Sequence, residues 1–226
     1  MLRAAVRLDL AMRLELGSPV HCSDATFGEL ADVVIDPTTR RVTHLVVAPH
    51  HRPEDARLVP VERARSGEGR EAAISLDATV AEIDRLDPVH ELAYLRLGEF
   101  PVDDPNWDVG VEHVLGLPYY QGIDTPTIEY DPHYTLGYDR IPKGEVEIRR
   151  SSAVTSADGH SLGHVDGFAI DGDHITHVVL QHGHLWGKRE VAIPIGAVDR
   201  VETDEVVLTL SKDEVGALES RRVHRW

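Results

Sequence analysis

Cysteine and long hydrophobic runs are what this sequence lacks most plainly. Cys22 is the only cysteine among the 226 residues, so no disulfide can form within the chain, which fits a reducing compartment. No apolar run approaches the ~20 residues that a membrane-spanning helix needs. Charged residues also interrupt the opening stretch, which argues against a signal peptide there. We therefore expect a cytoplasmic protein with no membrane insertion.

Basic residues are also scarce. The chain has 23 Lys and Arg against 39 Asp and Glu, for a formal net charge of −16. Such a surface repels the phosphate backbone, which argues against nucleic-acid binding. The last six residues, 221–226, are basic, and we expect them to form a solvated or loosely docked terminus.

What the chain does contain is an internal repeat. Each copy is too long for a solenoid module and has its own apolar residues, so the repeat predicts a pair of domains. The copies match with small gaps where turns are expected. The first copy reads Phe27-Gly28, Ile35-Asp36, Val42-Thr43-His44 and Val59-Pro60, and the second reads Leu162-Gly163, Ile170-Asp171, Ile175-Thr176-His177 and Ile193-Pro194.

The pattern within each copy is typical of short strands. Apolar residues occupy alternate positions, as in half-buried strands. Asp158-Gly159 and Asp171-Gly172 predict tight turns because glycine tolerates a positive φ. Gly28 and Gly163 predict a bulge or a close backbone approach. Each copy thus predicts roughly five or six strands, which is typical of a small barrel.

Each copy is expected to end in a short helix. Ser211 and Glu214 have capping-box spacing, in which each side chain satisfies a free amide of the first turn. In the first copy, Asp77 is predicted to cap a similar turn that carries Val80 and Ile83.

The segment between the copies, 88–145, is rich in proline and tyrosine. Proline blocks long regular elements, whereas the aromatic residues argue against disorder. We expect an ordered but irregular strap that packs on one or both barrels, with a short helix around 108–115. The predicted boundaries are 12–87 for the first domain, 88–145 for the strap and 146–219 for the second domain. We expect the aromatic residues of the strap to anchor it on the barrels, and contact with a partner is the alternative role. These residues are Trp107, Tyr119, Tyr120, Tyr130, Tyr134 and Tyr138.

The repeated residues resemble the PRC-barrel family. The shared pattern is an Asp-Gly turn, a Leu-Gly or Phe-Gly pair, a strand that ends in Asp, a strand of the form Ile-Thr-His-Val-Val and a later Ile-Pro or Val-Pro. The second copy matches more closely, because the first has Asp24-Ala25 where the second has Asp158-Gly159. The resemblance covers both copies and leaves the strap unmatched.

The resemblance implies a mainly β protein with two small PRC-barrel-like β-barrels, each used as a docking module without a shared catalytic residue set. The family includes the cytoplasmic domain of the photosynthetic reaction-centre H subunit. It also includes the C-terminal domain of the ribosome-maturation factor RimM, which binds a ribosomal protein. Likeness of fold assigns neither role to this chain.

Histidine is the residue type that most suggests chemistry, with 14 in the chain. His44 and His177 lie at matched strand positions between apolar neighbours, and we expect them to be hydrogen-bonded packing residues. Other histidines follow or precede the same strands and offer an alternative metal site. No cysteine or glutamate at tight ligand spacing accompanies them, so we predict no metal and no cofactor. The histidines of this alternative are His50, His51, His174, His182 and His184.

Cys22, beside His21, is the one candidate nucleophile. The second copy has no cysteine at the matching place and no third residue orients the pair. The carboxylates of Asp103-Asp104 and Asp171-Asp173 are expected to be solvated turn residues. The sequence therefore predicts no catalytic residue.

The function that these features favour is a non-catalytic protein-interaction or docking module. Its expected partner is another protein or a second copy in a homodimer. Two alternatives stay open: a ribosome or RNA maturation factor, by the RimM resemblance, and a metal or small-ligand sensor built on the histidine loops.

Overall fold

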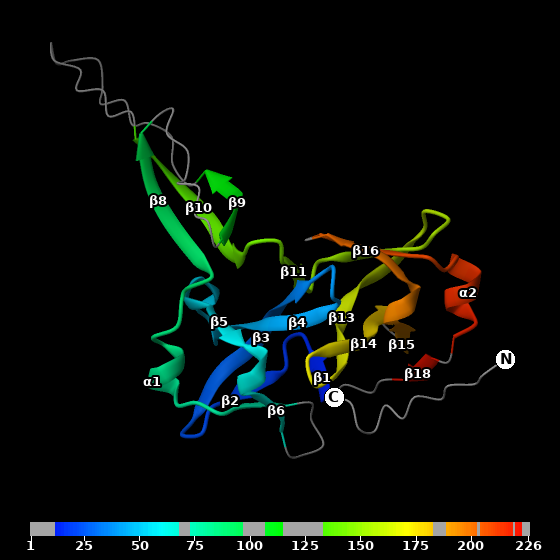
Figure 1. Cartoon of the computed structure of the whole chain (residues 1–226), viewed down its shortest axis with the longest axis horizontal. Helices are drawn as coiled ribbons and strands as arrows, with labels where there is room; N and C mark the ends of the chain where they lie inside the picture. Colours follow the sequence, from blue (N-terminus) through cyan, green and yellow to red (C-terminus); the bar gives the residue numbers. More distant parts are fainter. Residues whose placement is uncertain are drawn as a thin grey trace, which may run out of the picture.

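The protein is mainly β, as its sequence predicts. In the computed structural model a 15-stranded sheet forms the body and a separate 3-stranded sheet projects from it (Figure 1). No helix in the described part of the chain is long and apolar enough to cross a membrane. The structure describes residues 12–67, 73–96, 107–114, 133–182, 189–202, 204–218 and 220–222.

The first half of the body is built around two long antiparallel strands, β3 (Thr26–Asp36) and β4 (Arg41–Pro49). β2 and β5 flank them, β7 runs parallel to β2, and β6 pairs with β7. The remaining elements are β2 (Pro19–His21), η2 (Pro53–Asp55), β5 (Arg57–Pro60), η3 (Val61–Arg63), β6 (Ala64–Ser66), β7 (Ile74–Leu76) and α1 (Val80–Ile83).

The second half has the same pairings in the same order. β13 (Ser161–Asp171) and β14 (His174–His182) are the long strands, and the parallel pair is β12 with β17. The ladders shift register at matching places, between Leu30 and Asp32 in one half and between Val165 and Gly167 in the other. Its remaining elements are β12 (Ala153–Thr155), β15 (Arg189–Pro194), η4 (Ile195–Ala197), β16 (Val198–Glu202), β17 (Glu205–Leu208), α2 (Lys212–Gly216) and β18 (Ser220–Arg222).

Two short strands pair with the opposite half. β1 (Met12–Glu15), which precedes the first half, pairs with β13, and β11 (Val146–Arg149), which precedes the second half, pairs with β3. The registers correspond, because Leu14 stands opposite Phe168 and Ile148 opposite Val33. β3 and β13 therefore each pair with two strands of their own half and with one strand from outside it.

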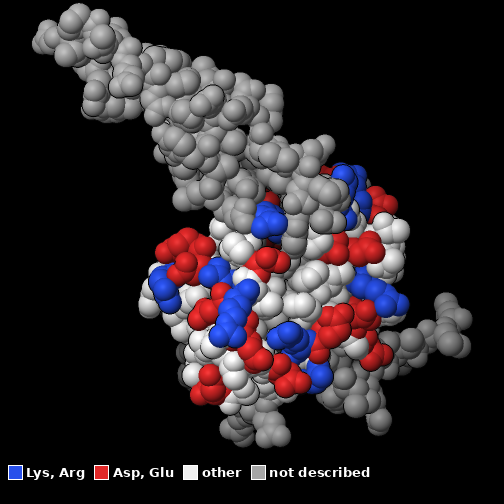
Figure 2. All heavy atoms as spheres, turned by 60° about the vertical axis from the view of Figure 1, so that its left-hand side comes forward, with Lys and Arg blue, Asp and Glu red and all other residues white. Residues whose placement is uncertain are grey.

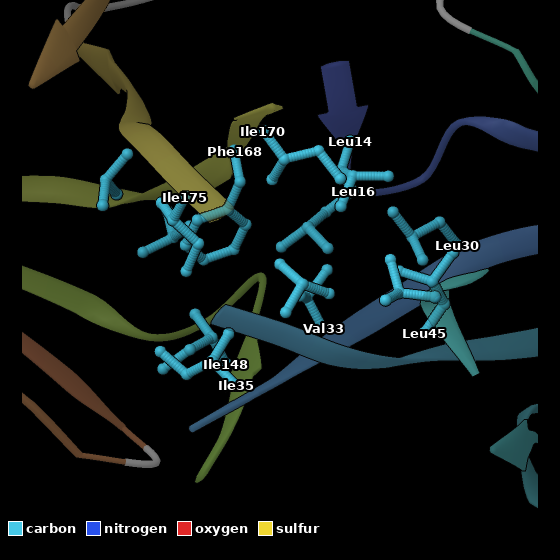
Figure 3. Packing of buried hydrophobic residues seen from close by; sticks show 14 of the residues in the cluster. Leu14, Leu16, Leu30, Val33, Ile35, Leu45, Ile148, Phe168, Ile170 and Ile175 are labelled. Atoms are coloured by element: carbon cyan, nitrogen blue, oxygen red, sulfur yellow. The ribbon is translucent and has the colours of Figure 1, made fainter. Parts of the chain in front are cut away.

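One apolar core results from this exchange. The largest buried cluster contains residues of both halves and of both exchanged strands, including the fully buried Leu14, Ile148 and Ile170 (Figure 3). The strands form one continuous path instead of two separate sheets. The halves are also joined where their hairpins meet: Val42 N–H donates to Asp173 O at 2.9 Å, and Ile175 N–H donates to Arg40 O at 3.1 Å.

A capped helical turn ends each half, and α1 and α2 lie at opposite sides of the body in Figure 1. The predicted capping box of Ser211 and Glu214 is present. In the first half the prediction of Asp77 as the cap is wrong, since Thr79 is the N-cap and Glu82 completes the box. Asp24 accepts a hydrogen bond from the Val80 N–H at 2.9 Å, which ties that helix to the β2–β3 turn.

The structure corrects the prediction of an irregular strap over 88–145. Its described residues form a three-stranded antiparallel sheet in the order β8-β10-β9: β8 (His90–Arg96), β9 (Trp107–Val114) and β10 (His133–Pro142). The helix expected around 108–115 is strand β9 instead. We call this sheet the arm, which extends away from the body in Figure 1. Trp107, Tyr134 and Tyr138 lie on its strands, while Tyr119, Tyr120 and Tyr130 lie outside the described residues.

The close approach of β1 to β13 can be tested at Gly167. A Cβ at this position would lie 2.2 Å from the Leu14 carbonyl oxygen, so Gly167→Ala must push β1 away. We expect a loss of about 2–4 kcal/mol in the free energy of unfolding, measured by urea denaturation. Gly216→Ala is the control, since nothing lies within 4 Å of its Cβ and alanine favours the helix. Equal stability of the two variants would contradict the strand exchange.

Candidate functional site

A cluster of charged side chains lies partly buried where the arm joins the body. Asp32 comes from β3, and Glu147 and Arg149 come from β11. His90 is the first residue of β8, and Asp139 is the seventh residue of β10. Arg149 stands opposite Asp32 in the ladder. The residues Glu147 and Asp139 are only 2% and 4% exposed. Burial of these two carboxyl groups requires that each finds a charged or hydrogen-bonding partner.

Arg149 is the centre of the cluster. Its Nη2 donates to Asp139 Oδ2 at 2.6 Å, and its Nε donates to Glu147 Oε2 at 2.9 Å. His90 Nδ1 bonds the other oxygen of Asp139. Glu147 Oε1 is buried without a hydrogen-bond partner among the described residues. One arginine therefore links the sheet of the body to the arm, and one carboxylate oxygen is left incompletely satisfied.

Burial sets the protonation of this cluster. Desolvation raises the pKa of Glu147 to about 7 and that of Asp32 to about 6, with Arg149 opposing the shift in both. The hydrogen bond to Asp139 raises the pKa of His90. The cluster consequently exchanges protons near neutral pH, which is a property of functional sites and of structural ion networks alike.

The neighbouring contacts favour a structural role as the seat of the arm. Val89 and Ile141, at the root of the arm, pack in a second apolar cluster with Val34, Val46 and Leu58 on the outer face of the first half. The three cavities described below are lined by other residues. The charged cluster thus completes a contact surface and is not placed in any of these cavities.

The second half carries a related ion cluster with the charges exchanged. By register, Arg13 and Glu15 of β1 correspond to Glu147 and Arg149 of β11. Arg13 Nη2 lies 2.8 Å from Glu190 Oε2 and 3.1 Å from Glu15 Oε1. Both halves therefore place ion pairs on the exchanged strand, but with opposite signs at matched positions.

The strand histidines make the local hydrogen bonds expected of packing residues. His44 Nδ1 lies 3.1 Å from Thr43 Oγ1, and His177 Nδ1 lies 3.1 Å from Thr176 Oγ1. Burial lowers the pKa of His177, which favours its neutral form.

The loop histidines are not brought together. His174 and His182 begin and end β14, about 26 Å apart along a strand that rises about 3.3 Å per residue. β4 and β14 meet only at their first residues, so His50 and His51, which follow β4, lie at the opposite end of the sheet from His182. His184 lies outside the described residues. In the parts of the chain that the structure describes, no group of three His, Cys, Asp or Glu side chains could hold a metal.

The other candidates take structural positions. Cys22 is buried, and desolvation raises its thiol pKa, the opposite of what an activated nucleophile needs. Asp173 pairs with Arg41 at 2.9 Å, and Asp103-Asp104 lie outside the described residues. In the basic terminus, 221–222 belong to β18 and pair with β15, a correction to the loose terminus expected from sequence, while 223–226 are not described.

Three cavities lie where the two halves meet. The first, of about 430 Å³, lies between the β13–β14 hairpin and η3 with β6. A second, of about 20 Å³, lies between the β3–β4 hairpin and η4 with β16. A third, of about 480 Å³, is lined by residues that include Arg41, His44 and Glu145. The first two are formed by corresponding elements of the two halves and differ mainly in how full they are.

Comparison with known proteins adds one finding. Residues 148–216 match a family model described as "Uncharacterized protein conserved in bacteria (DUF2171)". The match runs from within β11 to the last residue of α2, and so includes half of the strand that pairs with the first half. No curated protein matches the chain.

The raised pKa values predict that stability falls as pH rises. Unfolded Glu147 and Asp32 lose their protons near their ordinary pKa values of 4.5 and 3.8, whereas the folded groups keep them to about 7 and 6. The folded state therefore binds more protons, and the free energy of unfolding declines between these limits. The stabilisation from His90 is present at low pH and is lost as pH rises past its raised pKa, which adds to the decline.

Glu147→Gln isolates the largest contribution, because glutamine resembles the protonated carboxyl group. We expect the decline between about pH 5 and pH 8 to shrink by about 2 kcal/mol, measured by urea unfolding at each pH. Glu54→Gln removes the same charge from the exposed η2 and should leave the decline unchanged. The same pH dependence in both variants would show that Glu147 is ionised throughout.

Proposed function

We propose that this chain is a non-catalytic docking protein built from two PRC-barrel-like units. The observation that supports this best is that the carboxyl groups whose pKa values burial raises most, those of Glu147 and Asp32, lie in the cluster that seats the arm. Asp139, Glu147, Arg149 and His90 bond one another and hold the arm on the first half. An enzyme instead directs such groups at a reacting atom in a cavity.

The unit itself fits a docking role. Both halves have the same strand pairings and each ends in a capped helical turn, so the conserved feature is a scaffold. Acidic and basic side chains are interspersed over the described residues on the face shown in Figure 2. A mixed surface of this kind suits protein partners better than a phosphate backbone.

The arm supplies the asymmetry that a docking protein needs. It is attached to the first half through Val89, Ile141 and the charged cluster. Two otherwise similar halves thus present different outer surfaces, so one partner can be bound in one orientation.

The experiment that tests the proposal is quantitative cross-linking followed by sedimentation of the purified complex. We expect a complex of fixed stoichiometry with another protein or with a second copy. A monomer that forms no such complex in its native lysate or at high concentration would contradict the docking role. Co-sedimentation with ribosomal subunits at low salt would instead favour the ribosome-maturation alternative, and micromolar zinc or nickel binding in equilibrium dialysis would favour the sensor.

A further inference from the structure

The two corresponding cavities between the halves differ because one is filled by an arginine. Arg40 crosses from the β3–β4 turn and donates from Nη1 to Ile195 O at 3.0 Å and from Nη2 to Val198 O at 3.2 Å. Arg40 lines a groove between the halves whose remaining cavity has a volume of only about 20 Å³. We call this the filled groove and its counterpart, of about 430 Å³, the open groove.

Arg40 holds this position at a cost in backbone energy. Its φ is +58°, in the left-handed region that residues other than glycine rarely adopt. A residue kept in a strained conformation points to a compensating contact. The two hydrogen bonds to backbone carbonyls of the other half are such a contact.

The open groove is built from the matching elements, but the β13–β14 turn is two residues shorter than the β3–β4 turn and has no arginine at the matching place. Asp173 stands at the position of Arg40. Each of these residues accepts a backbone hydrogen bond from the matching strand of the other half: Val42 N–H donates to Asp173 O, and Ile175 N–H donates to Arg40 O. Asp173 is too short to cross to η3 and pairs with Arg41 instead. In the same way, Val61 and Ala64 correspond to Ile195 and Val198, whose carbonyl groups accept hydrogen bonds from Arg40. Val61 and Ile195 are the first residues of η3 and η4, and Ala64 and Val198 are the C-cap residues.

The lining of the open groove has the layout that a long cationic side chain needs. Met12, Val61 and Ile170 form apolar walls for a methylene stem, and Glu62 and Asp173 supply carboxylates. Arg65 also lines the groove, where its Nη1 donates to Glu62 O at 2.6 Å and Ala64 O at 2.9 Å. Because Asp173 already pairs with Arg41, Glu62 is the lining carboxylate that remains for a bound cation.

We propose that the open groove binds an arginine side chain of a partner protein at the place that Arg40 takes in the filled groove, with the Glu62 carboxylate as its main acceptor because Ala64 O already accepts from Arg65. This inference rests on the proposed docking function and names the chemistry that the partner must present. Arginine fits better than lysine, because its planar group can donate in two directions at once, as Arg40 does.

The test is an NMR titration of the full-length ¹⁵N-labelled protein with N-acetyl-arginine methylamide. We expect saturable shifts of the amides of 61–66 and 170–173 with a Kd in the millimolar range, as is typical of so small a ligand. The citrulline analogue, which has the same shape without the charge, should bind about tenfold more weakly. No shift at these amides up to about 50 mM, or an equal response to both compounds, would overturn the inference.

Two substitutions that exchange the residues of the two grooves serve as controls. Asp173→Arg should fill the open groove as Arg40 fills its counterpart and abolish the titration, and Arg40→Asp should open a second site and add shifts at 195–201. If Asp173→Arg fails to fold, Glu62→Gln should still weaken binding severalfold, because it removes the carboxylate that faces the bound cation. Unchanged affinity in the glutamine variant would count against the site.

The outcome is separable from that of the docking proposal. Arginine binding in the groove without any macromolecular complex would support the site and contradict the docking role. A complex that Asp173→Arg leaves intact would support docking through another surface and overturn the groove as its contact. Self-association that this variant abolishes would identify a second copy as the source of the arginine.

Discussion

Strand exchange between the two halves is the constraint on which the rest of this structure depends. β1 completes β13 and β11 completes β3, so neither half has a full set of strands of its own. Leu14 and Ile148, at the centres of the exchanged strands, are fully buried. Pulling the halves apart would expose both side chains and leave the ends of two long strands unpaired, so the halves share one core.

The exchange also explains which matched positions kept their chemistry and which did not. Leu14 and Ile148 face the core and are both aliphatic, because a much smaller residue would leave a cavity there and a polar one an unpaired group. Arg13 and Glu147 lie on the same strands but belong to the ion clusters, and their charges are opposite. Divergence between the halves is thus concentrated outside the core, where one half seats the arm and the other does not.

Local patterns predicted the elements well and their assembly poorly. The Asp171-Gly172 turn, the close approach at Gly28, whose Cβ would lie 1.9 Å from Ala48 O, and the box at Ser211 each depend on a few neighbouring residues. The arm was missed because prolines that lie outside its strands, or at the end of one, were taken to break the whole segment, although Trp107 and the valines that follow it are typical of a strand. The charged cluster was missed because its members are far apart in sequence. One signal was available: Asp32 interrupts an apolar strand at the place where the second copy has Gly167.

The buried cluster and the filled groove show two ways in which this scaffold uses arginine at a junction. Burying charges is expensive, and an apolar replacement is often as stable, so stability alone does not account for Arg149 at the root of the arm. What an arginine adds is direction, because its planar donors fix the position of each acceptor. Arg149 fixes the arm on the body through Asp139 and Glu147, and Arg40 fixes one hairpin on the opposite half through two carbonyls. The open groove is a third junction, where Asp173 stands at the place that corresponds to Arg40. Its geometry suits an arginine supplied by another molecule.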